Sequence, residues 1–430
     1  MVGLTVPPSG VDGRDGHQRV GRARSGARSD VGPAGPGGGG RLDDPPSAGD
    51  RADDEEAFTA MGGWPAVLAR LLAGEDLGAR HAALALGEVL SGRATAAQLA
   101  AFVTALRAKG ETVEEMAGLV RAMLHHAEPL QLAGDLVDTC GTGGDRSSSI
   151  NVSTMAAFVV AGSGAPVCKH GGRAASSAAG SADVLEALGV AIDLAPSGVA
   201  RCVEEVGMGF CFAPRFHPAM RFAIPVRREL GIPTVFNFLG PLANPARARL
   251  QVVGVSDPLM AETMLGVLAA NGARRAMVVH GADGLDELST TGPTTVLELA
   301  AGGGPGSAPG DVLEPASASA ALGTAEASAA RSIRRYLVDP ADLGLAPATV
   351  ADLRGGDPAT NAEVVRRVLG GAAGPHRDIV LLNAAAGLVV AGRAADLRAG
   401  IELAAAVIDD GRALATLDAL IRVSQAAAAG

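Results

Sequence analysis

The stretch "DTCGTGGDRSSSINVST", residues 138–154, concentrates glycines, hydroxyl side chains and carboxylates. Its Gly141–Asp145 turn follows an apolar run, Leu136–Cys140, that is typical of a buried strand, and a helix is expected soon after, over Asn151–Ser163. Glycines after a strand let backbone N–H groups converge on an anion, and a helix N-terminus adds partial positive charge. The pattern predicts an anion-binding loop, although a plain tight turn would use the same residues. It is not a dinucleotide-binding fingerprint, because Arg146 replaces the third glycine, and it lacks the Gly-Lys-Ser/Thr of a Walker loop.

A second glycine turn follows in "CKHGGRAASSAAGSAD", residues 168–183. Lys169 and Arg173 flank the glycine pair, and Ser176, Ser177 and Ser181 come next. Cations and convergent N–H groups are what a phosphate cradle needs. Either turn alone could be a loop with solvated charges. Two such turns, each before a helix and separated by one helix and one short strand, favour a phosphate-binding site.

Oxygen-bearing side chains suited to a divalent cation accompany these turns. Asn151–Thr154 ("NVST") supplies groups that can meet phosphate oxygens or a hydrated Mg²⁺. Asp286 and Glu287 lie just beyond the apolar run Ala276–His280. Adjacent carboxylates after a strand can be only a solvated loop. Opposite a phosphate cradle they are also what Mg²⁺ bridging to a polyphosphate requires.

The elements that must position these residues fall into two kinds. From Trp64 to Leu132 the apolar spacing is helical, and capping boxes begin at Thr95 and Thr112. After Asp135, short apolar runs such as "LVDTC", "APVCK", "GFCFA", "LQVVGV" and "AMVVHG" alternate with helical stretches. Buried parallel strands with crossover helices fit this alternation. We therefore predict an α/β protein: a small helical N-terminal lobe, and a larger α/β domain with a mostly parallel central sheet flanked by helices.

The predicted domain organisation has four segments. Residues 1–56 are rich in Gly, Pro, Arg and Asp and are expected to be a disordered extension. Residues 57–132 form the helical domain, and residues 133–430 form the α/β domain. Residues 301–329 are of low complexity and are expected to be an inserted surface loop, followed by a strongly helical remainder.

Composition narrows the class of protein. Hydrophobic residues make up 48 % of the 430 positions, which allows a large core, and the net charge of −10 argues against nucleic-acid binding. The four cysteines form no CxxC pair, which favours reduced thiols in a cytoplasmic protein. No signal peptide is recognisable, and no apolar run reaches the ~20 residues of a membrane span. We expect no membrane partner.

The ordered set of motifs resembles anthranilate phosphoribosyltransferases. GTGGD, NVST, the KHGxRAxSS pattern with GSADVLEALG, "FAPRFHPAMRFAIPVRRELG" with "TVFNFLGPLANP", and "HGADGLDELSTT" occur in the order of that family. The resemblance covers about residues 64–423, interrupted by the 301–329 insertion. It implies transfer of a 5-phosphoribosyl group from phosphoribosyl pyrophosphate (PRPP) to the amino group of anthranilate in tryptophan biosynthesis. It also implies a homodimer, whose helices around residues 214–235 return to the small lobe.

The resemblance assigns roles to individual residues. Metal positions match Ser153, Asp286 and Glu287, with two Mg²⁺ ions per subunit. Lys169 can stabilise the charge that grows on the leaving pyrophosphate. Gly141, Gly172 and Arg227 match the anthranilate site, with Arg227 meeting the carboxylate. The PRPP positions are Gly141, Gly144, Asp145, Ser149, Asn151, Val152, Ser153, Thr154, Lys169, His170, Gly171, Gly172, Arg173, Ala174, Ala175, Ser176, Ser177 and Ser181.

One position departs from the family pattern, which has an asparagine at residue 172 where this chain has glycine. The same transfer to a different aromatic amine is therefore an alternative. A pyrimidine nucleoside phosphorylase shares the architecture, but it would need one phosphate site and no metal pair. A paralogue that binds nucleic acid should have lost the glycine loop and gained a basic face. No general base is obvious, and a structural role is expected for His170 and His217.

Overall fold

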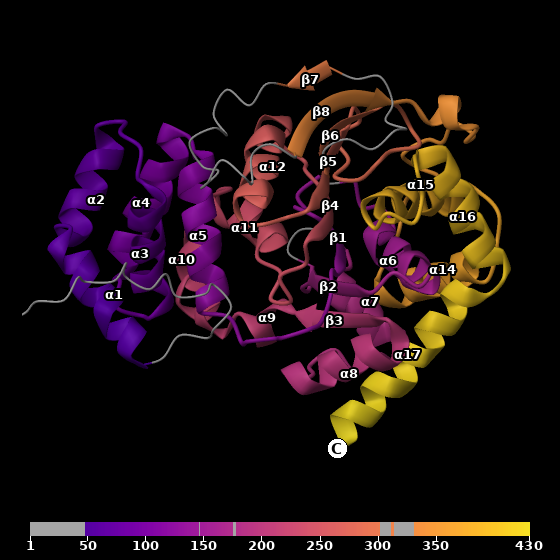
Figure 1. Cartoon of the computed structure of the whole chain (residues 1–430), viewed down its shortest axis with the longest axis horizontal. Coiled ribbons are helices and arrows are strands. Elements are labelled where there is room, and N and C mark those ends of the chain that lie inside the picture. The colour runs from indigo at the N-terminus through magenta and orange to yellow at the C-terminus, as the bar shows by residue number, and fades with distance from the viewer. Residues whose placement is uncertain (1–47, 146, 175–177, 302–310, 314–330) are drawn as a thin grey trace, which may run out of the picture. The chain divides into compact units, whose positions relative to one another are not determined.

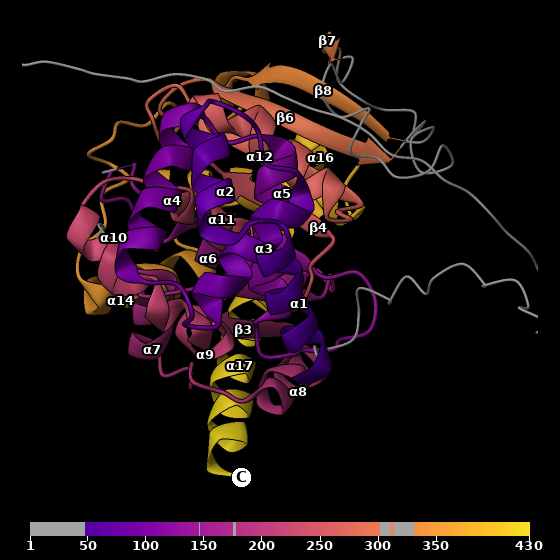
Figure 2. The same ribbon diagram turned by 90° about the vertical axis from the view of Figure 1, so that its left-hand side faces the viewer.

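The computed structural model describes residues 48–145, 147–174, 178–301, 311–313 and 331–430. These residues belong to one compact unit. Within the described residues, no helix has the length and apolar character needed to cross a membrane. The fold class is the predicted one: a helical bundle followed by a mostly parallel sheet with helices on both faces (Figures 1 and 2).

Among the described residues, five helices precede strand β1. Their apolar stripes form a shared core, in which Trp64 lies edge-on to Phe58 and Phe102 at ring-centroid distances of 5.4 and 5.7 Å. The predicted capping boxes at Thr95 and Thr112 are present, each hydroxyl accepting the N–H three residues on. The helices are α1 (Ala48–Ala60), α2 (Gly63–Leu72), α3 (Ala79–Leu90), α4 (Ala96–Lys109) and α5 (Val113–His125).

Helix α1 shows that the prediction of disorder for residues 1–56 is wrong for its last part. Its first nine residues, 48–56, belong to the segment that composition predicted to be disordered. These residues are helical because they continue into the part of α1 that carries Phe58, whose side chain is 4 % exposed and packs on Trp64. The rest of that segment, residues 1–47, lies outside the described residues.

The sheet has the strand order β3-β2-β1-β4-β5-β6-β8-β7. The first five strands in this order are parallel, and each corresponds to an apolar run recognised in the sequence. They are β1 (Val137–Gly141), β2 (Val167–Gly171), β3 (Met208–Phe212), β4 (Leu250–Gly254) and β5 (Arg275–Gly281). Because β1 lies between β2 and β4, the chain reverses its direction of winding there. In open α/β sheets, ligands bind at the carboxyl ends of the strands beside such a reversal.

Antiparallel strands lie at the other edge, and one of them, β8, departs from the expected helical remainder. Strands β6 (Thr294–Ala301), β7 (Asp311–Leu313) and β8 (Arg331–Val338) complete the sheet. Strand β8 was expected to be helical, but its residues pair with β6 along eight positions. Strand β7 falls within the expected insertion 301–329, whose other residues, apart from the end of β6 at 301, lie outside the described ones.

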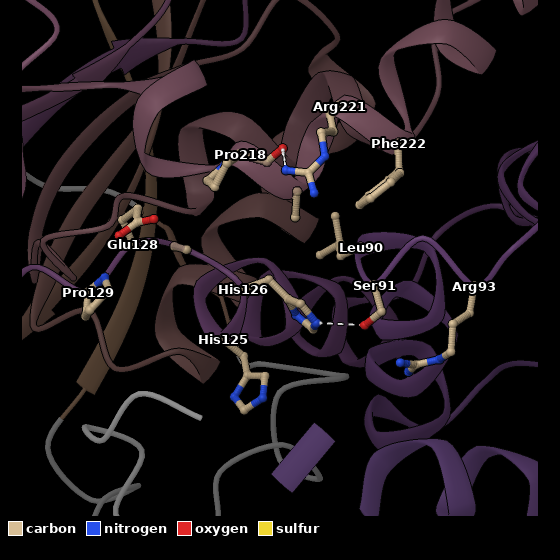
Figure 3. Close-up of a pocket in the computed structure, with 12 residues that line it drawn as sticks. Leu90, Ser91, Arg93, His125, His126, Glu128, Pro129, Pro218, Arg221 and Phe222 are labelled. Carbon is tan, nitrogen blue, oxygen red and sulfur yellow. Dashed lines mark hydrogen bonds between the residues drawn. The ribbon is translucent and has the colours of Figure 1, made fainter. Parts of the chain in front are cut away.

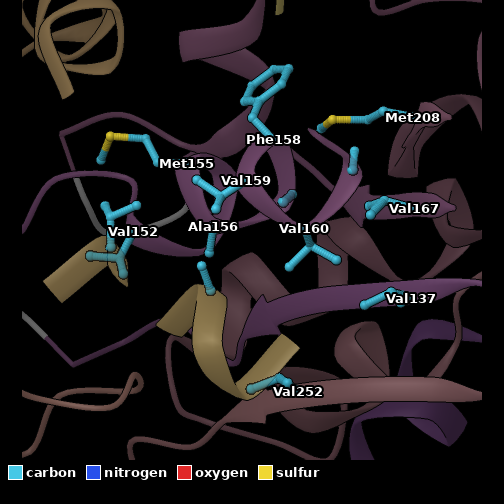
Figure 4. Close-up of a cluster of buried hydrophobic side chains, with 14 of the residues drawn as sticks. Val137, Val152, Met155, Ala156, Phe158, Val159, Val160, Val167, Met208 and Val252 are labelled. Atoms are coloured by element: carbon cyan, nitrogen blue, oxygen red, sulfur yellow. The ribbon is translucent and has the colours of Figure 1, made fainter. Parts of the chain in front are cut away.

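Two hydrophobic cores lie on opposite faces of the sheet. Successive residues of a strand point to opposite faces, so Val252 and Met277 join one core while Val253 and Val278 join the other. The first core is centred on α6 (Val152–Gly162), whose Met155, Phe158 and Val160 side chains are fully buried (Figure 4). The second core is continuous with the helical bundle.

The remaining helices cover the two faces and carry parts of the site. Helix α6 packs against α15 (Pro375–Val390) and α17 (Arg412–Ala429), and α12 (Ala261–Ala270) packs against α5 (Figure 1). Helix α10 (Ile224–Leu230) packs against α4, and α11 (Phe236–Leu242) against α5 and α12. The other α-helices are α7 (Ser181–Ala187), α8 (Pro196–Val206), α9 (Ala213–Phe216), α14 (Pro358–Leu369) and α16 (Leu397–Asp409); 3₁₀ turns span Pro218–Phe222, Pro258–Met260 and Pro340–Leu343.

Candidate active site

The first glycine loop begins where β1 ends. Gly143 and Gly144 have φ angles of 70° and 82°, a left-handed conformation that favours glycine. The Gly143 N–H donates to Asp286 Oδ2 at 2.7 Å. A Cβ at Gly141 would lie only 2.2 Å from the same oxygen, so a side chain there would displace the carboxylate. The glycines therefore bring the loop and the predicted metal-binding carboxylate into direct contact.

The segment that carries the two carboxylates, Asp286 and Glu287, lies against the ends of two neighbouring strands. Gly141 of β1 and Gly254 of β4 are register partners, and the Asp286 backbone carbonyl passes so close to Gly254 that no side chain fits there. Glu287 Oε1 accepts the Ser153 N–H, at the first turn of α6, at 3.1 Å. The structure thus brings Ser153, Asp286 and Glu287, the three predicted metal positions, to one place beside the glycine loop.

Burial raises the pKa of both carboxyl groups. For Asp286 the nearby Asp145 carboxylate raises the pKa further, and for Glu287 the Asp286 carboxylate does so. Lys169 opposes these effects on both groups. The raised pKa values mean that the two carboxylates have little water around them and that the positive charge of Lys169 does not fully offset their negative charge.

Lys169 is the buried cation of the site. Its side chain is 2 % exposed, and Nζ donates to the Thr139 carbonyl and to Ser153 Oγ, the latter at 3.3 Å. Thr139 in turn donates from Oγ1 to the Ser153 carbonyl at 2.9 Å. These bonds tie β1, β2 and the start of α6 together and fix the ammonium group beside the predicted metal ligands.

The donor set fits Mg²⁺ bound jointly with a substrate. Hard oxygen ligands with uncompensated negative charge are what this cation prefers, usually with substrate phosphates and water completing its coordination. Among the described residues, no three histidine, cysteine, aspartate or glutamate side chains converge into a closed metal site. The oxygen atoms present are the Asp286 and Glu287 carboxylates and the Ser153 hydroxyl, a set whose chemistry suits Mg²⁺.

The second glycine loop follows β2, and its predicted phosphate-binding arginine, Arg173, pairs with carboxylates of this chain. Arg173 pairs with Asp183 at 2.9 Å and Glu186 at 2.8 Å, so the guanidinium is held by α7 in this structure. Asp183 also accepts the Ala174 and Gly180 N–H groups, each at 2.9 Å, which closes the loop onto the helix. Ser181 Oγ lies 3.5 Å from the Gly172 carbonyl. Residues Ala175, Ser176 and Ser177 lie outside the described residues.

The other predicted PRPP positions line the first loop and the start of α6. Ser147 Oγ donates to Asp145 at 2.5 Å and accepts the Ser149 N–H at 3.1 Å, which links Ser149 to the Asp145 carboxylate through one hydroxyl. Val152 and Thr154 are buried in α6, at 1 % exposure each. Asn151 precedes α6, and its amide bonds to other parts of the chain rather than to the helix.

The predicted acceptor residues come from different elements. Gly172 has space beside it, since an added Cβ would meet only the Ala213 Cβ at 3.8 Å. Arg227 lies on α10 with its guanidinium over the Phe236 ring, 5.3 Å from the centroid. Burial lowers the pKa of Arg227. None of the hydrogen bonds and ion pairs found among the described residues joins Arg227 to Gly141 or Gly172.

His170 and His217 lie ring against ring, with centroids 5.1 Å apart. His170 Nδ1 is 3.1 Å from the Gly240 carbonyl, and His217 Nε2 is 2.9 Å from the Ala243 carbonyl, so each ring donates to the α11 region. Burial lowers the pKa of His170 to about 3 and that of His217 to about 4. Both imidazoles are therefore neutral near pH 7 and donate hydrogen bonds to backbone carbonyl groups, while the PRPP contact of His170 stays a prediction.

Two buried polar residues that sequence reasoning missed support the second loop. Asp138, on β1, accepts the His170 N–H at 3.2 Å and an Asn244 Nδ2 hydrogen at 2.7 Å. Asn244 also donates to the Cys168 carbonyl at 2.8 Å. The only signal for them was position: Asp138 interrupts the apolar run of β1, and Asn244 lies within the "GPLANP" motif.

A separate cavity of about 450 Å³ lies where α3, the end of α5 and the 218–222 turn meet (Figure 3). His126 crosses from the end of α5 toward α3, where its Nε2 lies 3.3 Å from Ser91 Oγ. None of the predicted site residues lines this cavity. It is therefore distinct from the glycine-loop site.

Comparison with known proteins agrees with this geometry over both parts of the chain. Residues 133–414 match the glycosyl transferase family a/b domain, and residues 65–127 match the helical bundle domain of the same family. An anthranilate phosphoribosyltransferase of Roseiflexus castenholzii is 51 % identical over 356 residues, which is 83 % of this chain and 96 % of that protein.

Solved structures show the same similarity. The anthranilate phosphoribosyltransferase of Thermus thermophilus superposes with a TM-score of 0.73 at 38 % identity, covering 84 % of this chain and 99 % of that one. The Saccharomyces cerevisiae enzyme, solved in complex with PRPP and Mg, gives 0.71 at 26 % identity over 86 % and 99 % of the chains. In complex with 4-fluoroanthranilate it gives 0.66 at 25 % identity, over 87 % and 99 %. The chain belongs to the anthranilate phosphoribosyltransferase family.

Proposed function

We propose that this enzyme transfers the 5-phosphoribosyl group of PRPP to the amino group of anthranilate, giving N-(5-phosphoribosyl)anthranilate and pyrophosphate. The observation that carries the proposal is the convergence at the ends of β1, β2 and β4. There, Gly141–Asp145, Lys169 and the Asp286–Glu287 pair meet within hydrogen-bonding distance of one another or of shared partners. Neutralising a departing pyrophosphate needs this combination of N–H donors, buried cation and metal-binding carboxylates.

On the donor side, Ser153, Asp286 and Glu287 would hold Mg²⁺, with two ions per subunit. The bound cation would supply positive charge for the diphosphate. The backbone of the Gly141–Asp145 loop, the first turn of α6 and Lys169 bind and orient the phosphate oxygens. The yeast relative, solved in complex with PRPP and Mg, supports the use of PRPP and Mg²⁺.

On the acceptor side, Arg227 binds the anthranilate carboxylate while Gly141 and Gly172 border the ring. Burial lowers the pKa of Arg227 because the half-buried guanidinium has lost part of its hydration. A carboxylate partner would replace that hydration with a charge-assisted hydrogen bond and so stabilise the charged form. The aromatic amine then needs to be aimed at C1 of the ribose, so positioning is the second large contribution to the rate. Because α10 belongs to the helical part, closing of the two parts around the acceptor would complete the site.

Four further assignments are part of the proposal. The enzyme acts as a homodimer in the cytoplasm, with PRPP and anthranilate as small-molecule substrates and no nucleic-acid or membrane partner. The helical domain comprises residues 57–132 together with helices around 214–235. The α/β domain comprises residues 133–430. The segment 301–329 is an insertion.

Pyrophosphate release from PRPP, measured with anthranilate and with a panel of substituted aminobenzoates, tests the proposal. Anthranilate should give the highest kcat/KM, and release should depend on both Mg²⁺ and acceptor. Preference for another aminobenzoate would retain the phosphoribosyl transfer and change the acceptor, with Gly172 making room for the larger ring. Phosphorolysis of a pyrimidine nucleoside without pyrophosphate release would contradict the proposal.

A further inference from the structure

A distant segment of the chain lies alongside the first glycine loop. The Ile150 N–H donates to the Leu353 carbonyl at 3.0 Å, and the Gly355 N–H donates to the Ser148 carbonyl at 2.8 Å. Between these bonds, Ser149 and Arg354 form an antiparallel bridge. Residues 353–356, which we name the strap, thus hold the loop from outside the sheet.

The contact between strap and loop is close and includes an unfavourable backbone conformation. Ser148 has a φ of 53°, which is costly for a residue with a side chain and persists only where surrounding contacts enforce it. The bond from Gly355 to the Ser148 carbonyl is one such contact. An added Cβ at Gly355 would lie 2.9 Å from the Ser149 carbonyl oxygen and 2.7 Å from Asn361 Oδ1. The strap therefore requires glycine at position 355.

Asn361, on α14, joins the strap to both glycine loops. Its side chain is 2 % exposed; Oδ1 accepts the Gly356 N–H at 2.8 Å and Nδ2 donates to Asn151 Oδ1 at 2.9 Å. The Asn151 amide continues the chain of bonds, since its Nδ2 donates to the Ala179 carbonyl at 3.0 Å. Two side-chain amides thus connect α14, the first loop and the end of the second loop.

We propose that Asn361 is a positioning residue for the phosphoribosyl donor, acting through Asn151 to set the separation of the two glycine loops. This rests on the proposed function, because the loops are assigned there to PRPP. Both ends of the Asn151 amide are engaged by the protein, so the Asn151 side chain contributes the position of the loop. Asn361 is not needed to begin α14, because Asp357 Oδ1 already caps that helix by accepting the Thr360 N–H at 2.8 Å.

Two substitutions separate the bonds of Asn361. Asn361→Asp keeps an acceptor for Gly356 and removes the donor to Asn151, whereas Asn361→Ala removes both. Loss of one buried hydrogen bond corresponds to about tenfold in binding. We expect the KM for PRPP to rise about tenfold in Asn361→Asp and at least as much in Asn361→Ala, with the KM for anthranilate within twofold of the wild type.

The matched control is Ser424→Ala. Ser424 is fully buried and makes two comparable bonds, accepting from Ala191 N and donating to the Ile421 carbonyl, but it lies on α17 away from the loops. Its loss should lower the melting temperature without changing either KM. A rise in the KM for PRPP in Ser424→Ala equal to that in the Asn361 variants would overturn the proposal, because general loosening would then explain both.

Amide hydrogen exchange in the substrate-free protein tests the same proposal without an activity measurement. The amides of Ile150 and Gly355 should exchange faster in Asn361→Ala than in the wild type, while those of the Ser424 region should not. Unchanged exchange together with an unchanged KM for PRPP would refute the role of Asn361. Failure of the wild-type protein to consume PRPP would instead refute the proposed function, and the exchange result would still stand.

Discussion

The surroundings of Asp286 and Glu287 disfavour the ionised form of both carboxyl groups. Burial raises the pKa of both groups, and a raised pKa in a folded acid means that stability falls as pH rises through the window between its unfolded and folded values. These carboxylates therefore cost stability at neutral pH in the absence of a cation. A function that uses the charge explains why they are retained.

Asp286→Asn and Glu287→Gln should abolish most turnover while leaving the protein equally or more stable. Each amide retains an acceptor oxygen, for Gly143 and Ser153 respectively, but removes the charge. We expect kcat to fall at least 100-fold and the urea midpoint at pH 8 to stay constant or rise. Asp283→Asn, in the same loop, is the control: hydrogen bonds from Thr291 and Ser289 lower the pKa of Asp283, so this change should lower the midpoint and spare Mg²⁺ dependence. Near-normal rates in both site variants would remove the metal assignment.

Gly172→Asn should lower the KM for anthranilate several-fold. The side chain has space, because an added Cβ would meet only Ala213, and a hydrogen bond to a small ligand contributes about 0.5–1.5 kcal/mol. The KM for PRPP should change little. Gly171→Ala provides the contrast, since its Cβ would lie 2.2 Å from Ser181 Oγ and disturb the second loop. An unchanged or higher KM in Gly172→Asn, with another aminobenzoate preferred by the wild type, would contradict anthranilate as acceptor.

At the scale of elements, the parallel strands could be predicted and the antiparallel ones could not. The five parallel strands are buried on both faces, so they read as continuous apolar runs. Strand β8 ("RSIRRYLV") carries three arginines because it lies near the sheet edge, where Arg334 pairs with Glu298 at 2.9 Å across the ladder. The long low-complexity stretch between β6 and β8 is unlike a short hairpin turn, so the sequence did not indicate that these two strands pair.

Truncation should distinguish α1 from the residues that precede it. A chain beginning at Ala48 should keep the stability and activity of the full chain, because residues 1–47 are dominated by Gly, Pro, Arg and Asp and contain no aromatic side chain. A chain beginning at Met61 loses Phe58, whose burial against Trp64 is of a kind that contributes about 3–5 kcal/mol. Thermal unfolding of the two truncations measures the difference. Equal midpoints would show that α1 contributes nothing to the bundle.

At the scale of the whole molecule, the site depends on contacts between residues far apart in sequence. The glycine loops could be predicted because strand, turn and helix are consecutive. Asn361 could not, because it lies 210 residues from Asn151 and sits in a helix without any motif of its own. Likewise, the engagement of Arg173 by Glu186 follows from the path of α7, which composition does not determine.

The paired histidines connect the sheet to the helical part and should make the whole fold sensitive to acid. His170 and His217 bind carbonyl groups of the α11 region, and α11 packs on α5 and α12. Their pKa values of about 3 and about 4 lie below the ordinary 6.5, so the unfolded chain binds more protons than the folded one between these limits. The contribution of the two histidines to the free energy of unfolding is thus fully present above pH 6.5 and is lost as pH falls toward 4, by an amount on the order of several kcal/mol.

His217→Gln keeps a donor for the Ala243 carbonyl and cannot titrate. Urea unfolding from pH 7 to 4.5 should therefore show a shallower loss of stability than in the wild type. Parallel pH profiles for the two proteins would assign the acid sensitivity to other groups.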